Sequence, residues 1–342
     1  MKQIIRLPVL VLLAGLALLF SVTTSATPEN IDLGGLVLSV SDSRTAQIFH
    51  IVDQLSQWDI YTHDQYARWA TATQLLDQRD RELLQQHAEM RKKRGWGHGF
   101  EQTFLVDDSI EDAAAKGIAA HFLSPSEANA ERDILLHFAP KLDPLLRQRT
   151  AEIDALQQQL VAERTRLTPL VQQLAHFAEV KKPATVMVFL VANSDDHNGG
   201  GGANGGRLVV EVPLLDTIGT LLHESLHQLL DPQKQRIRTA AENAGVEYTT
   251  LNEGIAYAMY PGIMADTDEG DRLIEELVRM QLHGTPASDP FLQFHLVAAV
   301  IRPLLRGCAC REFRPYANQH PCGTLIADLG DAHFLVGKHI GV

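Results

Sequence analysis

The chain has 342 residues, of which 45% are hydrophobic and 21% are charged. These values suit one large or two medium domains, and they exclude collagen, low-complexity polymers, disulfide-dense miniproteins and wholesale disorder. Lys and Arg number 30 against 42 Asp and Glu, and the resulting net charge of −12 argues against a nucleic-acid partner, because phosphate contacts need clustered basic charge. We interpret the one basic run, Arg91-Lys-Lys-Arg94, as a solvated helix end.

The N-terminus resembles a secretory signal. Lys2 and Arg6 precede an apolar run over residues 7–20, which is shorter than the roughly 20 residues that a membrane span needs. Small residues follow, so we predict a signal peptide over residues 1–26 with cleavage after Ala26. The protein is then exported, to the periplasm or the medium, and keeps no stable membrane span. An uncleaved anchor is the alternative.

Residues 27–183 are predicted to form a helical N-terminal region. Apolar residues recur near a 3.6-residue period over 46–55 and again over 153–177. Pro169 interrupts the second stripe, either as a kink or as the first residue of a new helix after Thr168. Clean heptads are too few for a coiled coil, so ordinary helix packing is expected.

The pattern changes to strands after Pro183. Residues 185–192 and 208–212 read as two buried strands. Between them, residues 193–206 include six glycines and are too long for a tight turn, so we expect a flexible loop that is either disordered or a lid. His197, with Asp195 and Asp196, could bind a metal there, but a solvated loop is the simpler interpretation.

An amphipathic helix follows the second strand and carries His223-Glu224-Ser-Leu-His227. Asp216 is a suitable N-cap, and Asp231-Pro232 ends the helix. Because His223 and His227 are four residues apart, both imidazoles project from one face and could bind one zinc ion. Glu224 could then act as general base toward a water molecule, which is the H-E-x-x-H pattern. The simpler alternative is an apolar helix with two partly buried histidines.

A catalytic zinc site needs a third protein ligand. The metzincin pattern fails, because Leu230 and Gln233 stand where its Gly and third His belong. Glu253, which is expected to open a short helix that Pro261 terminates, could reach the metal from a neighbouring helix. Its alternative role is a capping box with Thr250, since the T-x-x-E spacing is present. Downstream of H-E-x-x-H, we favour the ligand.

Together, His223-Glu224-Ser-Leu-His227 and Leu251-Asn252-Glu253-Gly254-Ile-Ala256 resemble the gluzincin zinc metallopeptidases, notably the peptidase-MA-like group. The resemblance covers residues 185–262. It implies that His223, His227 and Glu253 hold one Zn²⁺ per chain and that Glu224 is the catalytic base. It also implies a preceding strand whose exposed edge aligns an extended substrate, for which residues 208–212 are placed. Thermolysin-like members carry an acidic residue one turn after the third ligand, where this chain has Tyr257.

Two further features lie outside this paired motif. An oxyanion stabiliser is expected from Tyr257, Tyr260, Tyr316 or His320, and Tyr257 is the first choice because it lies one helical turn after Glu253. The cysteines all fall near the C-terminus, where an oxidising compartment favours Cys322 paired with Cys308 or Cys310 and one free thiol.

The predicted fold is α+β and mostly helical: a signal peptide (1–26), the helical region (27–183), a zincin-like catalytic core with a small sheet (184–306) and a Cys-containing tail packed on the core (307–342). A further helix is expected over residues 290–302 with Asp289 as N-cap. The expected function is an exported zinc metallopeptidase acting on peptides or proteins. One alternative keeps the zinc hydrolase but changes the bond that is cut, for example to an amide in cell-wall peptide. The other alternative is a non-enzymatic exported scaffold or binding protein with a structural metal or none.

Overall fold

The computed structural model describes residues 29–97, 99–263 and 272–312. The predicted signal peptide, Tyr316, His320 and the predicted disulfide of Cys322 lie outside the described residues.

Five strands form one mixed sheet in the order β1-β2-β3-β5-β4. They are β1 (Glu29–Asp32), β2 (Leu36–Ser41), β3 (Ala184–Ala192), β4 (Gly201–Asn204) and β5 (Arg207–Val212). The three central strands are parallel to one another, whereas β1 and β4 pair antiparallel at the two edges. The sheet therefore combines a buried parallel centre with two short edge strands.

Helices make up most of the described chain, so the α+β, mostly helical prediction is confirmed. Within the described segments, none of these helices has the length and apolar character that a membrane crossing requires. They are α1 (Arg44–Leu55), α2 (Gln65–Ala72), α3 (Gln78–Arg94), α4 (Phe100–Phe104), α5 (Ile110–Ala119), α6 (Pro125–Ala162), α7 (Arg164–Phe177), α8 (Thr217–Leu230), α9 (Lys234–Ala244), α10 (Tyr248–Tyr257), α11 (Arg272–Leu282) and α12 (Pro290–Glu312).

The sheet crosses the predicted division at residue 183. β2 comes from the region that we predicted to be helical, yet it pairs in parallel with β3 over residues 36–41 and 184–189. We did not predict β1 and β2: β1 is short and largely polar, and β2 directly precedes the helical pattern of α1. The helical region and the segment after it thus share one sheet and one hydrophobic core.

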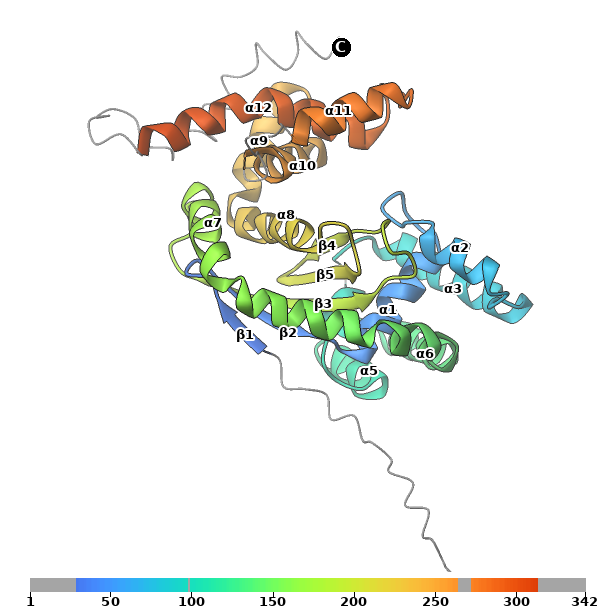
Figure 1. Ribbon diagram of the computed structural model, residues 1–342. Helices are drawn as coiled ribbons and strands as arrows, with labels where there is room; N and C mark the ends of the chain where they lie inside the picture. The colour runs from blue at the N-terminus through green and yellow to red at the C-terminus, as the bar shows by residue number, and fades with distance from the viewer. Residues whose placement is uncertain (1–28, 98, 264–271, 313–342) are drawn as a thin grey trace, which may run out of the picture.

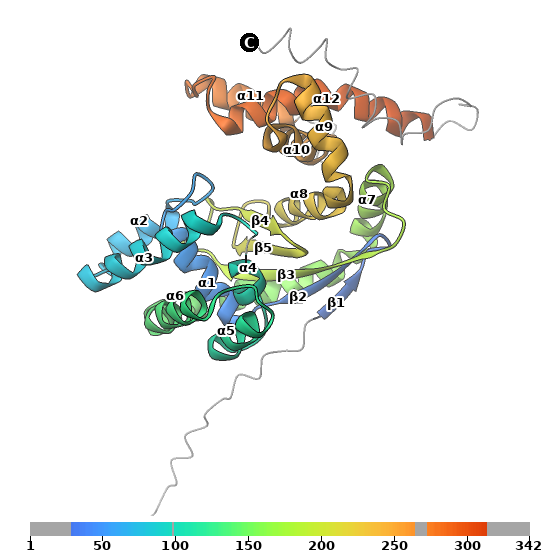
Figure 2. The ribbon, with the colours of Figure 1, turned by 180° about the vertical axis from the view of Figure 1, so that it is seen from behind.

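The helices lie on both sides of the sheet (Figure 1). α1, α5 and α6 lie on one side, and α8 packs on the other side against β4 and β5. α9 to α12 lie beyond α8, as the reverse view also shows (Figure 2). α8 is therefore enclosed between the sheet and a second helical layer, which explains its broad apolar surface.

Several helix boundaries differ from the sequence prediction. The long helical stretch breaks at Glu163, between α6 and α7, and Pro169 lies inside α7 rather than at its start. α12 begins at Pro290, where the Asp289 carboxylate accepts from the Leu292 amide, as predicted. It continues to Glu312 and so crosses the predicted boundary at residue 307.

A buried network of charges joins α1, α3, α4 and α6. Arg91 is fully buried and its guanidinium contacts Asp53 at 2.7 Å and Glu101 at 2.5 Å. The prediction that the basic run is a solvated helix end is therefore wrong for Arg91, whose partners Asp53 and Glu101 lie on other helices. His87 donates to Asp53 and Glu131, each at 2.9 Å. Each buried charge thus has an opposite partner, as its desolvation requires.

This network predicts a pH-dependent stability. Burial alone would lower the pKa of His87, but the charges of Glu131 and Asp53 raise it to about 9, from an ordinary value of 6.5. Because the folded pKa exceeds the unfolded one, this stabilisation is complete below pH 6.5 and is lost as pH rises through 9.

We expect the free energy of unfolding to fall as pH rises from about 6.5 to 9. Denaturant titrations between pH 6 and 10, on protein treated with a chelator to remove metal ions, measure it. The double variant His87→Leu/Glu131→Gln removes both members of the pair and should flatten that slope. An equal slope in both proteins would assign it to other groups.

Candidate metal centre

The histidines of the H-E-x-x-H pattern lie on the side of α8 that faces α10. Its N-terminus is capped as predicted, since the Asp216 carboxylate accepts from the Gly219 amide at 2.9 Å. Leu221, Leu222, Leu226, Leu229 and Leu230 are buried, which fixes the rotation of the helix. His223 and His227 then project toward α10.

Three possible ligand atoms converge where α8 meets α10. The Nε2 atoms of His223 and His227 are 3.3 Å apart, and each lies 3.4 Å from Oε2 of Glu253. An ion bound tetrahedrally at about 2.0–2.2 Å needs ligand spacings of about 3.3–3.6 Å. The three atoms thus have the spacing of three corners of one tetrahedron. Among the described residues, this is the one His/Cys/Asp/Glu group that could hold a metal ion.

Glu253 reaches this position from the middle of α10. The helix begins at Tyr248 with Glu247 as N-cap, so Glu253 does not open it and the alternative capping box with Thr250 is excluded. Pro261 does not end it directly either, because α10 passes into a π-helical turn over Ala258–Ile263. Burial would raise the pKa of Glu253, but His227 and His223 hold it well below its usual range.

The outer nitrogens of both imidazoles have partners. His223 Nδ1 lies 3.1 Å from the carbonyl oxygen of Tyr260, to which it can donate only as the Nδ1–H tautomer. That tautomer leaves the lone pair of Nε2 facing Glu253 and His227. The Nδ2 atom of Asn252 lies 2.8 Å from Nδ1 of His227, and exchanging the amide nitrogen and oxygen by a 180° rotation would offer the oxygen to Nδ1–H. Such partners fix a ligand's orientation and tautomer.

Glu224 lies between α8 and the edge strand β4. It is half-buried, and Gly201 of β4 approaches it so closely that a Cβ on Gly201 would lie 2.9 Å from Glu224 Cγ. Burial raises the pKa of Glu224 to about 7, with His223 lowering it and Glu253 raising it further. A carboxylate with a pKa near neutrality can both take up and release a proton at physiological pH.

Tyr257 packs directly on the centre. Its ring lies 4.6 Å from that of His223 and 4.2 Å from that of His295, between centroids. Burial and the charge of Glu253 raise the pKa of Tyr257, so its hydroxyl stays protonated. Its contacts hold the His223 ring in place, and its predicted role toward an oxyanion stays a prediction. Tyr260 is a weaker candidate, because its hydroxyl donates to Asp216.

The structure corrects the predicted edge strand. Residues 207–212, as β5, are internal and pair on both sides, with β3 and with β4. The edge strand is β4, which forms from the glycine-rich stretch that we predicted to be a loop. Four residues of that stretch pair with Arg207–Val210, and α8 packs directly on them. Asp195 turns the remaining loop by accepting from the amides of His197 and Asn198, which agrees with a solvated loop.

Sequence reasoning missed three residues that shape the centre. We named Asn252 only as part of a motif, although it directly precedes Glu253 and therefore comes close to the same imidazoles. Gly201 gave no signal beyond its membership of a glycine run. His295 lies on α12, outside both parts of the paired motif, and reaches Tyr257 through the packing of α12 on α10.

Comparison with models of protein families, with curated proteins and with solved structures found no match for this chain.

The packing of α12 on α10 gives a direct test of how Glu253 is held. A Cβ on Gly254 would lie 2.4 Å from Cγ1 of Val297, so Gly254→Ala overpacks this contact and should cost about 1–3 kcal/mol of stability. Denaturant unfolding measures that cost. Val297→Ala makes room, so the double variant should recover part of the loss; additive effects of the two substitutions would contradict the contact.

Proposed function

We propose that the protein is an exported zinc-dependent hydrolase that cleaves peptide bonds in peptides or proteins. The observation that carries the proposal is the spacing of the two Nε2 atoms and Oε2 at 3.3–3.4 Å, contributed by two separate helices. Two imidazoles and one carboxylate are also a ligand set found in catalytic zinc sites, where a fourth position stays open. The export rests on the N-terminal sequence alone.

The residues of the chain would divide the work in a simple way. His223, His227 and Glu253 hold the ion, while Tyr260 and Asn252 orient the imidazoles. A zinc ion there supplies a Lewis acid that polarises a carbonyl group and lowers the pKa of water. Glu224 takes the proton of the attacking water and passes it to the leaving amine, a task for which a carboxylate beside the open position is suited.

An extended peptide is the substrate class that the sheet favours. β4 is the last strand of the sheet, so one of its edges is unpaired among the described strands. Such an edge can bind an extended chain through main-chain hydrogen bonds. Since Gly201 of β4 lies against Glu224, a peptide paired with this edge would run past the proposed base.

Glu224 separates this proposal from a non-enzymatic protein with a structural metal. A structural site needs its ligands and their outer partners, and Glu224 is neither. Its burial between α8 and β4 costs free energy that a structural role would not require. A zincin-like catalytic core is accordingly part of the proposal.

The first prediction concerns the metal. The purified chain should bind one zinc ion, and Glu253→Ala should weaken binding by more than the roughly 10–100-fold that loss of an outer partner costs. Zinc is measured by mass spectrometry after chelation and reconstitution. Glu242→Ala removes an exposed carboxylate of α9 and is the matched control, expected to bind like the parent. A parent that takes up no zinc would overturn the centre.

The second prediction concerns the base. Glu224→Gln keeps the shape and burial of the side chain but cannot accept the proton, so zinc should remain at one per chain while kcat/KM falls by about 10²–10⁴-fold. A peptide library that includes cell-wall peptides supplies the substrate. Glu242→Gln controls for an unrelated carboxylate. Cleavage by Glu224→Gln at the parent rate would eliminate Glu224 as the base.

A further inference from the structure

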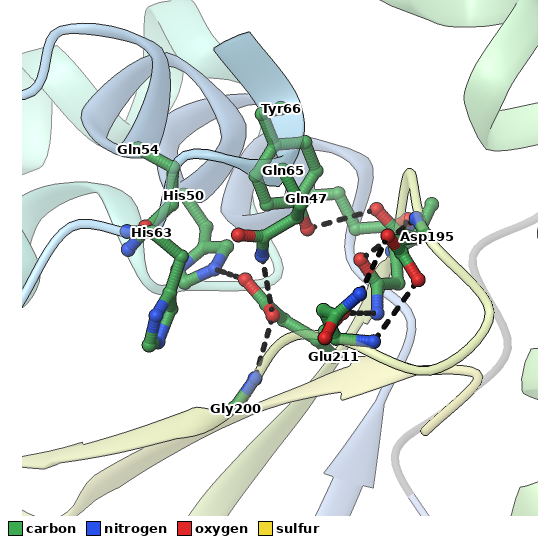
Figure 3. A network of polar contacts seen from close by, with 12 residues as sticks. Gln47, His50, Gln54, His63, Gln65, Tyr66, Asp195, Gly200 and Glu211 are labelled. Carbon is green, nitrogen blue, oxygen red and sulfur yellow. Dashed lines mark hydrogen bonds and ion pairs between the residues drawn. The ribbon is translucent and has the colours of Figure 1, made fainter. Parts of the chain in front are cut away.

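Glu211 brings a carboxylate into the buried interior next to the edge strand. Its side chain is 1% exposed on β5, and both of its neighbours along the strand, Val210 and Val212, are apolar. The carboxylate lies 2.8 Å from His50 Nε2, 3.0 Å from Gln65 Nε2 and 2.7 Å from the backbone nitrogen of Gly200 (Figure 3). Three separate segments, α1, α2 and the start of the edge hairpin, therefore meet on one side chain.

The donors in this network follow from the chemistry of the groups. An ionised carboxylate can only accept, so His50 donates through Nε2–H, alongside the Gln65 amide and the Gly200 N–H. Hydrogen bonds to a charged group are stronger than those between neutral groups. Gly200 is held twice, because its carbonyl oxygen also accepts from the backbone amide of Glu211 at 3.0 Å. Gly200 is thus fixed in place relative to β5, α1 and α2.

The fixed residue directly precedes the strand that lines the proposed centre. Gly201 is the first residue of β4 and the one that approaches Glu224. Space beside Gly200 is equally restricted, since a Cβ there would lie 3.0 Å from Nε2 of His63. His63 is itself held, through its backbone nitrogen, by the Gln54 side chain of α1 at 2.6 Å. Small displacements of Gly200 would therefore move β4 relative to Glu224.

We propose that Glu211 is a positioning residue through which α1 and α2 set the place of the β4 edge, and hence the path of an extended peptide past Glu224. The part of this inference that concerns the peptide rests on the proposed function. The part that concerns the position of β4 rests on the geometry alone. It gives the helical half of the chain a role in substrate alignment. Packing alone does not need a carboxylate at this position, because an apolar residue would fill the same interior without a desolvation cost.

Two substitutions at Glu211 test whether its hydrogen bonds, and not only its volume, position β4. In Glu211→Gln the amide oxygen can keep the bonds from Gly200 and Gln65, while the NH₂ group donates to the other tautomer of His50. Glu211→Val suits a strand but accepts no hydrogen bond. Glu131→Gln, which alters a fully buried carboxylate that bonds to His87, is the control for general destabilisation.

The experiment measures hydrogen exchange, zinc content and peptide cleavage in the same zinc-loaded full chains. In Glu211→Val the amides of residues 200–204 should lose about tenfold to hundredfold protection, as expected for loss of a bond to a charged group. Zinc should stay at one per chain. KM should rise about tenfold with a smaller change in kcat, because an edge that binds the peptide acts before the reaction. Glu211→Gln should restore both values to within a few-fold of the parent.

The outcomes are distinguishable. Unchanged protection of residues 200–204 in Glu211→Val, or an equal loss there in Glu131→Gln, overturns the positioning role. If residues 200–204 lose protection in Glu211→Val while KM stays unchanged, Glu211 does not affect substrate binding and that part of the proposal is overturned. A parent chain that binds zinc and cleaves no peptide contradicts the proposed function instead, and the exchange result still decides whether Glu211 holds the strand.

Discussion

The contact between α8 and α10 is the constraint on which the centre depends. Two imidazoles on one helix and a carboxylate on another come within 3.4 Å of one another. Such an arrangement is costly without a cation or protons to share, so the surrounding packing must enforce it. α12 packs against α10, and because Gly254 has no side chain the two helices approach each other closely. Helix packing thus brings these three side chains together.

A second constraint comes from the buried polar groups that join the helical half to the sheet. Arg91 with its carboxylates fixes α1, α3 and α4 to one another, and Glu211 ties α1 and α2 to the edge hairpin. Buried charges must be paired, and pairing them requires particular helix positions. These networks therefore make the fold more specific than apolar contacts alone would. They also explain why the strand beside Glu224 depends on residues near the N-terminus.

The local geometry of the centre followed from spacing, whereas its surroundings did not. Helical periodicity placed His223 and His227 on one face, and Asp216 marked the start of their helix, as the structure has it. Glu253 lies beside both imidazoles, as a ligand there would, but its helix begins earlier than we predicted, because Thr250 offered a false capping signal. The edge strand was assigned to residues 208–212, since a glycine run carries no strand propensity. β4 forms there because β5 on one side and α8 on another give its backbone partners and cover.

The sequence by itself therefore determined the residue types, their helical spacing, the mostly helical α+β class and the main strands β3 and β5. Those features depend on neighbours within a few residues, where period and capping chemistry decide the outcome. Tertiary structure alone decided that β1 and β2 join the sheet, that Arg91 is buried, that Asn252 and Tyr260 orient the imidazoles, and that β4 is the edge. Most of these depend on partners tens or hundreds of residues away, and a contact of that kind exists only once the whole core has packed. β4 pairs with the nearby β5, but its glycines form a strand because α8 also packs on them.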